Sequence, residues 1–220
     1  MSLLGRLHIK HYPWLPSHFQ NIYEWLHHTE PTWGYTIYRT TYTPQSHAAF
    51  PRVVDLTTKY MKDKFYEDYE SYFRFSPDAN EFKRAPFDEM WAHHKPRVIE
   101  DASQFDGTSI DHARDHFKAW ATDQGKVDSF PSYRMSVMIY EESFQTLQNA
   151  PLPENLPSRP EDMRRHYVKV VEASEEDPQP PFPGWIKCSL PKMFSVWSDM
   201  QEMSYLEDSY SLRSAGTDVL

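Results

Sequence analysis

Two histidines and one glutamate have the residue types and spacing that acid–base or metal chemistry uses. His112 and His116 stand four residues apart in HARDH, within a predicted helix, so both imidazoles lie on one helical face, as in a two-histidine metal clamp. Ala113 stands where the H-E-x-x-H pattern has its acid, and we expect no metal. The simplest interpretation is a solvated pair. The alternative is acid–base catalysis with Glu142, whose simpler role is to complement a helix dipole.

The stretch WGYTIYRTTY, residues 33–42, predicts an aromatic strand with one arginine, Arg39, in its middle. An arginine is costly to bury unpaired, and its planar guanidinium suits a carboxylate or a phosphate. Arg39 therefore pairs with an acid of a covering helix or reaches the sheet edge, or else it anchors an anionic ligand in an aromatic pocket.

Three further residues are candidates for the same ligand site. Arg134 opens a second predicted strand and comes near Arg39 if the two strands pair. Tyr38 and Tyr140 offer hydroxyl donors on the opposite face, although ordinary sheet packing is the simpler expectation for both.

Motifs for nucleotide and serine-hydrolase chemistry are missing, namely the P-loop, G-x-G-x-x-G and G-x-S-x-G. With only 6 glycines in the chain, a glycine-rich phosphate loop is effectively excluded, and we expect no cofactor. The single cysteine, Cys188, excludes an internal disulfide and is expected to be a buried small hydrophobe.

The composition describes an acidic, aromatic-rich chain. A net charge of −9 with dispersed Lys and Arg argues against nucleic-acid binding. Aromatic residues make up 15%, enough to build a core despite a mean hydropathy of −0.75. No apolar run approaches the ~18 residues of a membrane span, and residues 1–16 lack a signal-peptide apolar region. We therefore expect a soluble, cytoplasmic protein whose partner is a small molecule or a protein and not a membrane.

Periodicity and helix breakers predict an alternation of helices and strands. Helices are predicted within residues 17–30, 51–75, 109–123 and 193–203, with a short one after Glu141, and strands within 33–42, 133–140, 166–173 and 185–190. Residues 76–107 predict a long irregular connection with a short helix near Asp88–Trp91. This order predicts an α+β fold: a small mixed sheet with helices packed mainly on one face and a C-terminal strand–helix appendage. We expect strand 33–42 at the centre, with parallel neighbours where helices connect the strands.

Two details of the helices are also predicted. Ser17 and Gln20 have the spacing of a capping box. Pro51 suits a first helical turn, and the helix that follows it either breaks near Lys62–Lys64 or is covered on two sides.

The predicted organisation has five parts. They are an N-terminal helical segment (1–30), an α+β core (31–173), an acidic Pro-rich linker (174–184), a strand–helix appendage (185–206) and a flexible tail (207–220). The appendage helix carries a Met/Trp stripe that docks on its own domain or, in the alternative, on a partner.

Three blocks, WGYTIYRTTY, DGTSIDHARDHFKAW and YRMSVMIYEESFQTL, resemble a large group of uncharacterised proteins from filamentous ascomycete fungi. The resemblance covers roughly residues 30–175, and the group has no settled activity. Fungal arginine-containing cyclodipeptide synthases are also compact soluble proteins, but their Asp-Asp-x-x-Glu hallmark does not occur here.

Two functions follow as expectations. The first is a fungal-type binding or interaction protein. The second is a small-molecule enzyme of fungal secondary metabolism, remotely of the cyclodipeptide-synthase kind, which would hold an anionic group on Arg39 and use His112, His116 or Glu142 as acid or base.

Overall fold

A computed structural model describes residue 12 and residues 14–74, 84–127, 129–156, 160–173, 181–201, 205–211 and 218–220. The elements follow one another as α1 (Ser17–His28), β1 (Thr36–Arg39), α2 (Pro44–Arg74), α3 (Ala85–Ala92), β2 (Arg97–Ile99), α4 (Ala102–Phe105), α5 (Ile110–Asp123), α6 (Pro131–Arg134), β3 (Met135–Ile139), α7 (Glu141–Leu147), η2 (Pro153–Asn155), η3 (Pro160–Arg165), β4 (Tyr167–Glu172), β5 (Trp185–Ser189), η4 (Leu190–Lys192), α8 (Met193–Asp199) and α9 (Leu206–Ser211).

The strands form one five-stranded sheet in the order β2-β1-β3-β4-β5. β1 pairs in parallel with β2 and β3, whereas β4 pairs antiparallel with β3 and β5, so the sheet is mixed and the α+β prediction is confirmed. The parallel pairing of β1 and β3 follows from the helices that connect them. The central strand is β3 and not β1. The short strand β2, within the segment predicted to be an irregular connection, forms the edge of the sheet beyond β1.

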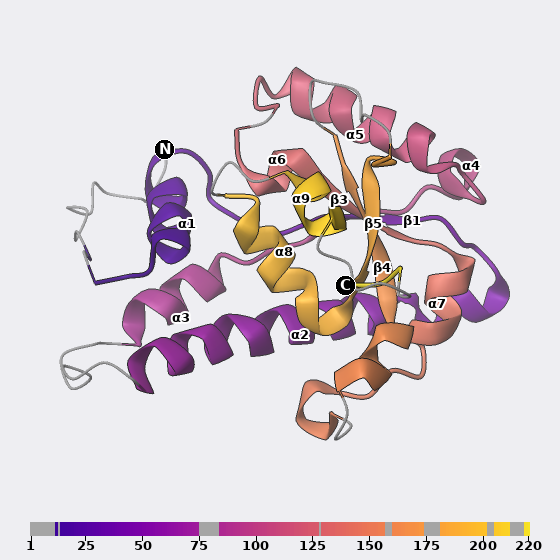
Figure 1. The fold of residues 1–220 in the computed structure, drawn as a ribbon. Helices are drawn as coiled ribbons and strands as arrows, with labels where there is room; N and C mark the ends of the chain where they lie inside the picture. Colours follow the sequence, from indigo (N-terminus) through magenta and orange to yellow (C-terminus); the bar gives the residue numbers. More distant parts are fainter. Residues whose placement is uncertain are drawn as a thin grey trace.

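Side chains alternate between two covered faces of the sheet. Ile37, Val137 and Val170 belong to the larger core, which also includes buried residues of α1, α2 and α8. Tyr38 points the other way, into a smaller cluster with residues of α4 and α5. Figure 1 shows α2 and α5 on opposite sides of the strands. Each fully buried large apolar side chain stabilises the fold by roughly 1.5–3 kcal/mol, which compensates for the few aliphatic residues.

Helix α2 is longer than the sequence predicts. It spans 31 residues and includes Pro51 in its interior, so the prediction of Pro51 in the first turn is wrong. Phe50 before the proline and Val53 after it are both buried, and this packing offsets the hydrogen bond that the proline cannot donate. Tyr60, Met61 and Phe65 are buried as well, and the helix does not break near residues 62–64 because it is covered on two sides.

Helix α1 begins differently from the prediction. Pro16 is its N-cap residue and no side-chain cap hydrogen bond is present there, so Ser17 does not form the expected capping box. The Gln20 amide instead donates to the Leu15 carbonyl at 2.6 Å.

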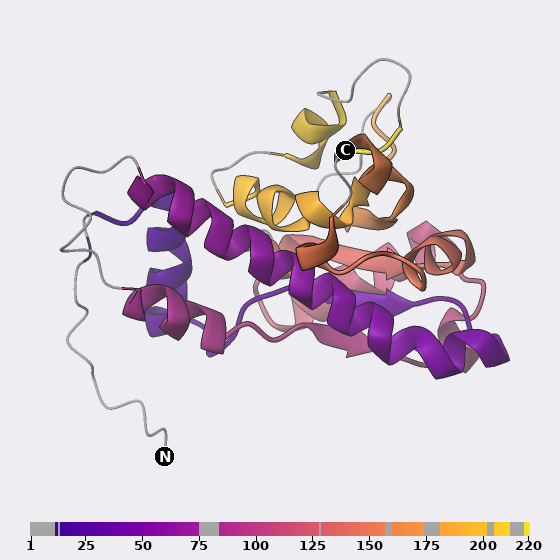
Figure 2. The ribbon, with the colours of Figure 1, turned by 90° about the horizontal axis from the view of Figure 1, so that it is seen from below.

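The C-terminal strand and helix are part of the main structure. β5 pairs with β4 over five residue pairs, from Tyr167↔Ser189 to Val171↔Trp185. Phe194 and Trp197 of α8 are fully buried, and Figure 2 shows α8 beside α2, so this helix docks on its own chain. Most of the predicted linker (174–180), part of the predicted tail (212–217) and Met203 of the predicted stripe lie outside the described residues. In the described part of the chain, no helix combines the length and apolarity that crossing a membrane requires.

Candidate functional site

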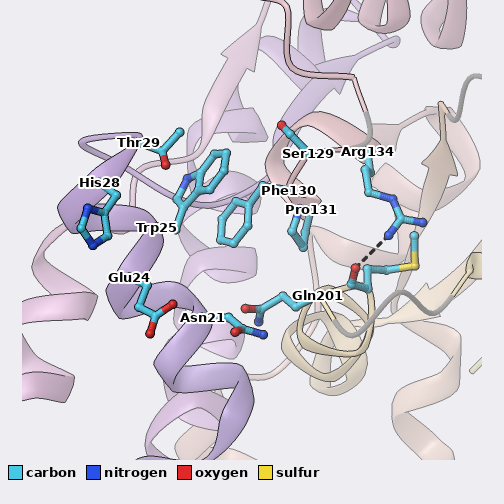
Figure 3. Close-up of a pocket in the computed structure, with 11 residues that line it drawn as sticks. Asn21, Glu24, Trp25, His28, Thr29, Ser129, Phe130, Pro131, Arg134 and Gln201 are labelled. Atoms are coloured by element: carbon cyan, nitrogen blue, oxygen red, sulfur yellow. Dashed lines mark hydrogen bonds between the residues drawn. The ribbon is translucent and has the colours of Figure 1, made fainter. Parts of the chain in front are cut away.

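A pocket of about 430 Å³ lies between α1, α6 and the residues that follow α8. Figure 3 shows Trp25 and Phe130 side by side on one wall and Asn21 and Gln201 opposite them. The lining residues are Asn21, Glu24, Trp25, His28, Thr29, Ser129, Phe130, Pro131, Arg134, Met200 and Gln201. Glu24, His28, Thr29 and Ser129 are exposed and form a polar rim.

The apolar wall is a stacked aromatic pair from two elements. The rings of Trp25 and Phe130 lie 4.1 Å apart between centroids and are inclined by 11°. Phe130 is the extended N-cap residue of α6, and Pro131 at the first helical position fixes the turn that presents it. The indole Nε1 of Trp25 is buried and finds no acceptor among the described residues.

Arg134 lies at one side of the pocket and is held by the protein itself. Its Nη1 donates to the Met200 carbonyl at 2.9 Å, and its Nη2 donates to Glu172 Oε1 at 3.2 Å. Glu172 is also buried, and its Oε2 accepts from the backbone N–H of Leu206 at 3.1 Å. Since a carboxylate already compensates the guanidinium charge, Arg134 orients the wall of the pocket without leaving it strongly positive.

Gln201 is the unusual residue of the lining. Its backbone is fixed by a 3.0 Å hydrogen bond from its N–H to the Ser198 carbonyl. Its side-chain Nε2 and Oε1 are both buried, and neither has a hydrogen-bond partner in the described part of the chain. A buried polar group without a partner costs about 1–3 kcal/mol, so this amide raises the free energy of the folded protein.

Arg39 does not line this pocket. It is 5% exposed, and its guanidinium donates to the Thr41 carbonyl at 2.9 Å, to Ser46 Oγ at 3.0 Å and to Glu100 Oε1 at 2.9 Å. The ring of Phe50 lies under it at 4.8 Å. Arg39 is therefore paired inside the protein, which was the alternative to an anion anchor. Its acidic partner, Glu100, follows β2 and does not belong to a covering helix as that alternative expected.

Arg134 and Arg39 are far apart along the same strand pair. β1 and β3 do pair, but in parallel, with Thr36 opposite Ser136 and Arg39 opposite Ile139. Arg134 precedes β3 and Arg39 ends β1, so the two arginines stand at opposite ends, and the expectation that strand pairing brings them close is wrong.

Tyr38 and His116 are brought together. The hydroxyl of Tyr38 on β1 and Nδ1 of His116 on α5 are 2.7 Å apart. Burial raises the pKa of the Tyr38 hydroxyl, and burial, assisted by Arg97 and His112, lowers the pKa of His116. His112 itself is exposed, and its backbone N–H is capped by Ser109 Oγ at 3.2 Å.

Tyr140 and Glu142 meet on another part of the sheet. The Tyr140 and Tyr167 hydroxyls are 3.4 Å apart, and the Tyr167 hydroxyl donates to Glu142. The bond from Tyr167 is the main cause that lowers the pKa of Glu142. Lys169 Nζ lies 3.9 Å from the ring centre of Tyr140, and burial lowers its pKa. This cluster has an ordinary structural explanation, because its polar groups satisfy one another.

The predicted catalytic and binding residues therefore occupy four different places. Arg39 lies on the α2 face, Tyr38 meets His116 of α5 (which also carries His112), Tyr140 and Glu142 lie beside β4, and Arg134 lies at the pocket. In the described residues no group of three or more His, Cys, Asp or Glu side chains is placed to hold a metal. Cys188 is buried as expected, and burial raises the pKa of its thiol to about 12, which makes it unreactive.

Trp25, Phe130 and Gln201 were not predicted from the sequence as site residues. Trp25 had a usable signal, because it lies in a predicted helix beside the stripe of Phe19, Ile22, Tyr23 and Leu26 without belonging to it. Gln201 had none, since its isolation depends on which segments surround it in the fold.

No family model, curated protein or solved structure matches this chain. The resemblance to a group of fungal proteins stays a prediction, and the site has to be interpreted from its own chemistry.

Proposed function

We propose that this protein is a binding protein of the fungal type that the sequence indicates. Its ligand is a small, flat, uncharged molecule held in the pocket between α1, α6 and α8. The ligand carries a hydrogen-bond donor beside an acceptor, as the edge of a lactam or a pyrimidine does.

The observation that carries this proposal is the Gln201 amide. One donor and one acceptor stand side by side at the wall of the pocket, both buried and without a partner among the residues that the structure describes. An amide side chain pairs with a matching donor–acceptor edge through two parallel hydrogen bonds. Because Gln201 breaks no side-chain hydrogen bond when it turns into the pocket, the rotation that meets a ligand costs little.

The choice of an uncharged ligand follows from the charges around the pocket. Glu172 compensates Arg134, and the exposed Glu24 lies at the rim. An anion would lose its hydration without a free positive group to replace it, whereas the wall of Trp25 and Phe130 suits a flat apolar body.

The enzyme alternative receives less support from the geometry. It requires Arg39 close to His112, His116 or Glu142, but Arg39 is occupied by Thr41, Ser46 and Glu100 on the other face of the sheet.

Native mass spectrometry and thermal shift with a panel of lactams and pyrimidines test the proposal. We expect a panel member to bind the wild type, and Gln201→Met, which keeps the side-chain size but removes both polar atoms, to weaken it by about tenfold or more. Gln124→Met is the matched control, because Gln124 is exposed at the end of α5. If Gln201→Met retains wild-type affinity for that compound, the assigned role of the amide is wrong.

A further inference from the structure

A second site, separate from the pocket, is indicated by the stripe that His112, His116 and Trp120 form on α5. These residues are spaced by four, so they lie on one face of the helix. The ring of Phe105 lies beside both histidines. Its centroid is 5.8 Å from the ring centroid of His112 and 5.0 Å from that of His116. All three stripe residues are at least partly accessible to solvent.

Arg97 of β2 reaches this stripe from the sheet. The register pairs Arg97 with Thr36 and Ile99 with Tyr38, so Arg97 points to the same face as Tyr38, toward α5. Its guanidinium carbon lies 4.1 Å from the ring centre of Trp120. It also lies close enough to His116 to lower the pKa of that imidazole.

The guanidinium of Arg97 makes no hydrogen bond or ion pair with the described residues, and its Nη1 is buried without a partner. Stacking on Trp120 gives the plane of the guanidinium a favourable contact, but it provides no acceptor for any of the five N–H donors. Burial lowers the pKa of Arg97, and the opposing contributions come from the Tyr38 and Tyr133 hydroxyls and not from a carboxylate. Arg39 shows the contrast, since its guanidinium has three protein acceptors.

His116 adds a second donor. With the Tyr38 hydroxyl as donor to Nδ1, the neutral ring carries its proton on Nε2, which becomes a hydrogen-bond donor. Arg97, His116 and His112 are thus three basic groups that gather at one place on a chain whose net charge is −9.

We propose that Arg97, His116 and His112 form a binding site for a phosphate group, with Trp120 as the surface on which Arg97 is held in place. The arginine fork donates to two phosphate oxygens, and the imidazole N–H groups donate to the third. The site is independent of the pocket at Gln201 and does not depend on the function proposed for it.

Phenyl phosphate and inorganic phosphate are the probes that test this site, with histidine ring resonances followed by NMR. The wild type is expected to show saturable shifts of the His116 and His112 signals. Arg97→Gln should weaken binding by about tenfold or more, since a hydrogen bond to a charged group contributes about 1.5–3 kcal/mol. Arg97→Lys, which keeps the charge but loses the fork, should bind with intermediate affinity.

Arg164→Gln is the control, because Arg164 is an exposed arginine on η3. It should bind phosphate like the wild type. The proposal is overturned if the His116 signals do not move with either probe, or if Arg97→Gln and Arg164→Gln bind phosphate equally well.

Discussion

Arg39 and Arg97 lie on adjacent strands but have different roles. The difference comes from the groups that surround each guanidinium, because the two residues are of the same type. Arg39 on β1 is 5% exposed and donates to two oxygens of its own segment and to Glu100. Arg97 on β2 has no acceptor in the described part of the chain. The first therefore stabilises the fold, whereas the second keeps its donors for another molecule.

Replacing Arg39 tests its structural role. Arg39→Met should lower the free energy of unfolding by about 2–3 kcal/mol, because the Thr41 carbonyl and Ser46 lose a charged donor inside the protein. Urea denaturation measures this loss, and Arg164→Met on the surface should change stability by no more than about 0.5 kcal/mol. A loss for Arg39→Met as small as that of the control would show that the buried contacts contribute little.

At the scale of elements, the segment before β1 is fixed against the segment before β2. Trp33 forms a bridge with His94, and the Trp33 ring lies 4.6 Å from the imidazole. Trp91 stacks on the same imidazole at 4.4 Å and 12°. Gly34, with φ +135°, allows this close approach, since an added Cβ would lie 3.3 Å from His94 Nε2 and 3.4 Å from the Lys95 carbonyl carbon.

Gly34→Ala should therefore destabilise the protein by about 1–3 kcal/mol, through the disfavoured backbone angle and the crowding of His94. Gly107→Ala is a suitable comparison, because Gly107 also has positive φ (+64°) but nothing lies within 4 Å of its added Cβ. Thermal unfolding should show the larger loss for Gly34→Ala. Equal losses for the two variants would mean that the contact with His94 has no energetic effect.

The same imidazole predicts a pH dependence. Burial lowers the pKa of His94 to about 4, whereas an unfolded histidine has a pKa of about 6.5. Below pH ~6.5 the unfolded state binds the proton more readily, so stability falls as the pH drops from about 6.5 to about 4, by about 2–3 kcal/mol in total.

Urea unfolding at a series of pH values measures this loss in the wild type and in His94→Phe, which cannot titrate. The fall of stability with pH should become shallower in His94→Phe than in the control His47→Phe, where the replaced histidine is exposed. Identical pH profiles for the wild type and His94→Phe would contradict the assignment.

Over the whole molecule, elements with an apolar pattern of their own were predictable, and the three-residue strand β2 was not. The helix expected within residues 109–123 is α5, Ile110–Asp123, and the strand expected within 185–190 is β5, Trp185–Ser189. β2 has only three residues, follows Pro96 and is formed by pairing with a distant strand, so no local pattern marks it. Because β2 was not predicted, Arg97 was not recognised as a candidate site residue.

The residues of the candidate sites were likewise predictable only where a local sequence pattern marks them. The i, i+4 spacing of His112 and His116 was visible in the sequence, and so was the position of Arg134 before a strand. The pocket was not, because Trp25, Phe130 and Gln201 come from three distant segments. Residue types at fixed spacing predict a shared face, whereas unpaired groups are revealed only after all segments have packed.

The central claim is that the Gln201 amide is kept for a ligand at a cost to stability, and the free energy of unfolding of Gln201→Met without ligand tests it most directly. Since the substitution removes two buried polar atoms that have no partner in the described segments, without changing the side-chain size, the variant should be more stable than the wild type by about 1–3 kcal/mol. In the presence of a saturating ligand that binds the wild type, this difference should shrink by about 1.4 kcal/mol or more, because the wild type binds that ligand about tenfold or more tightly than the variant. A ligand-free variant that is less stable than the wild type would show that the amide stabilises the fold, and would contradict the account.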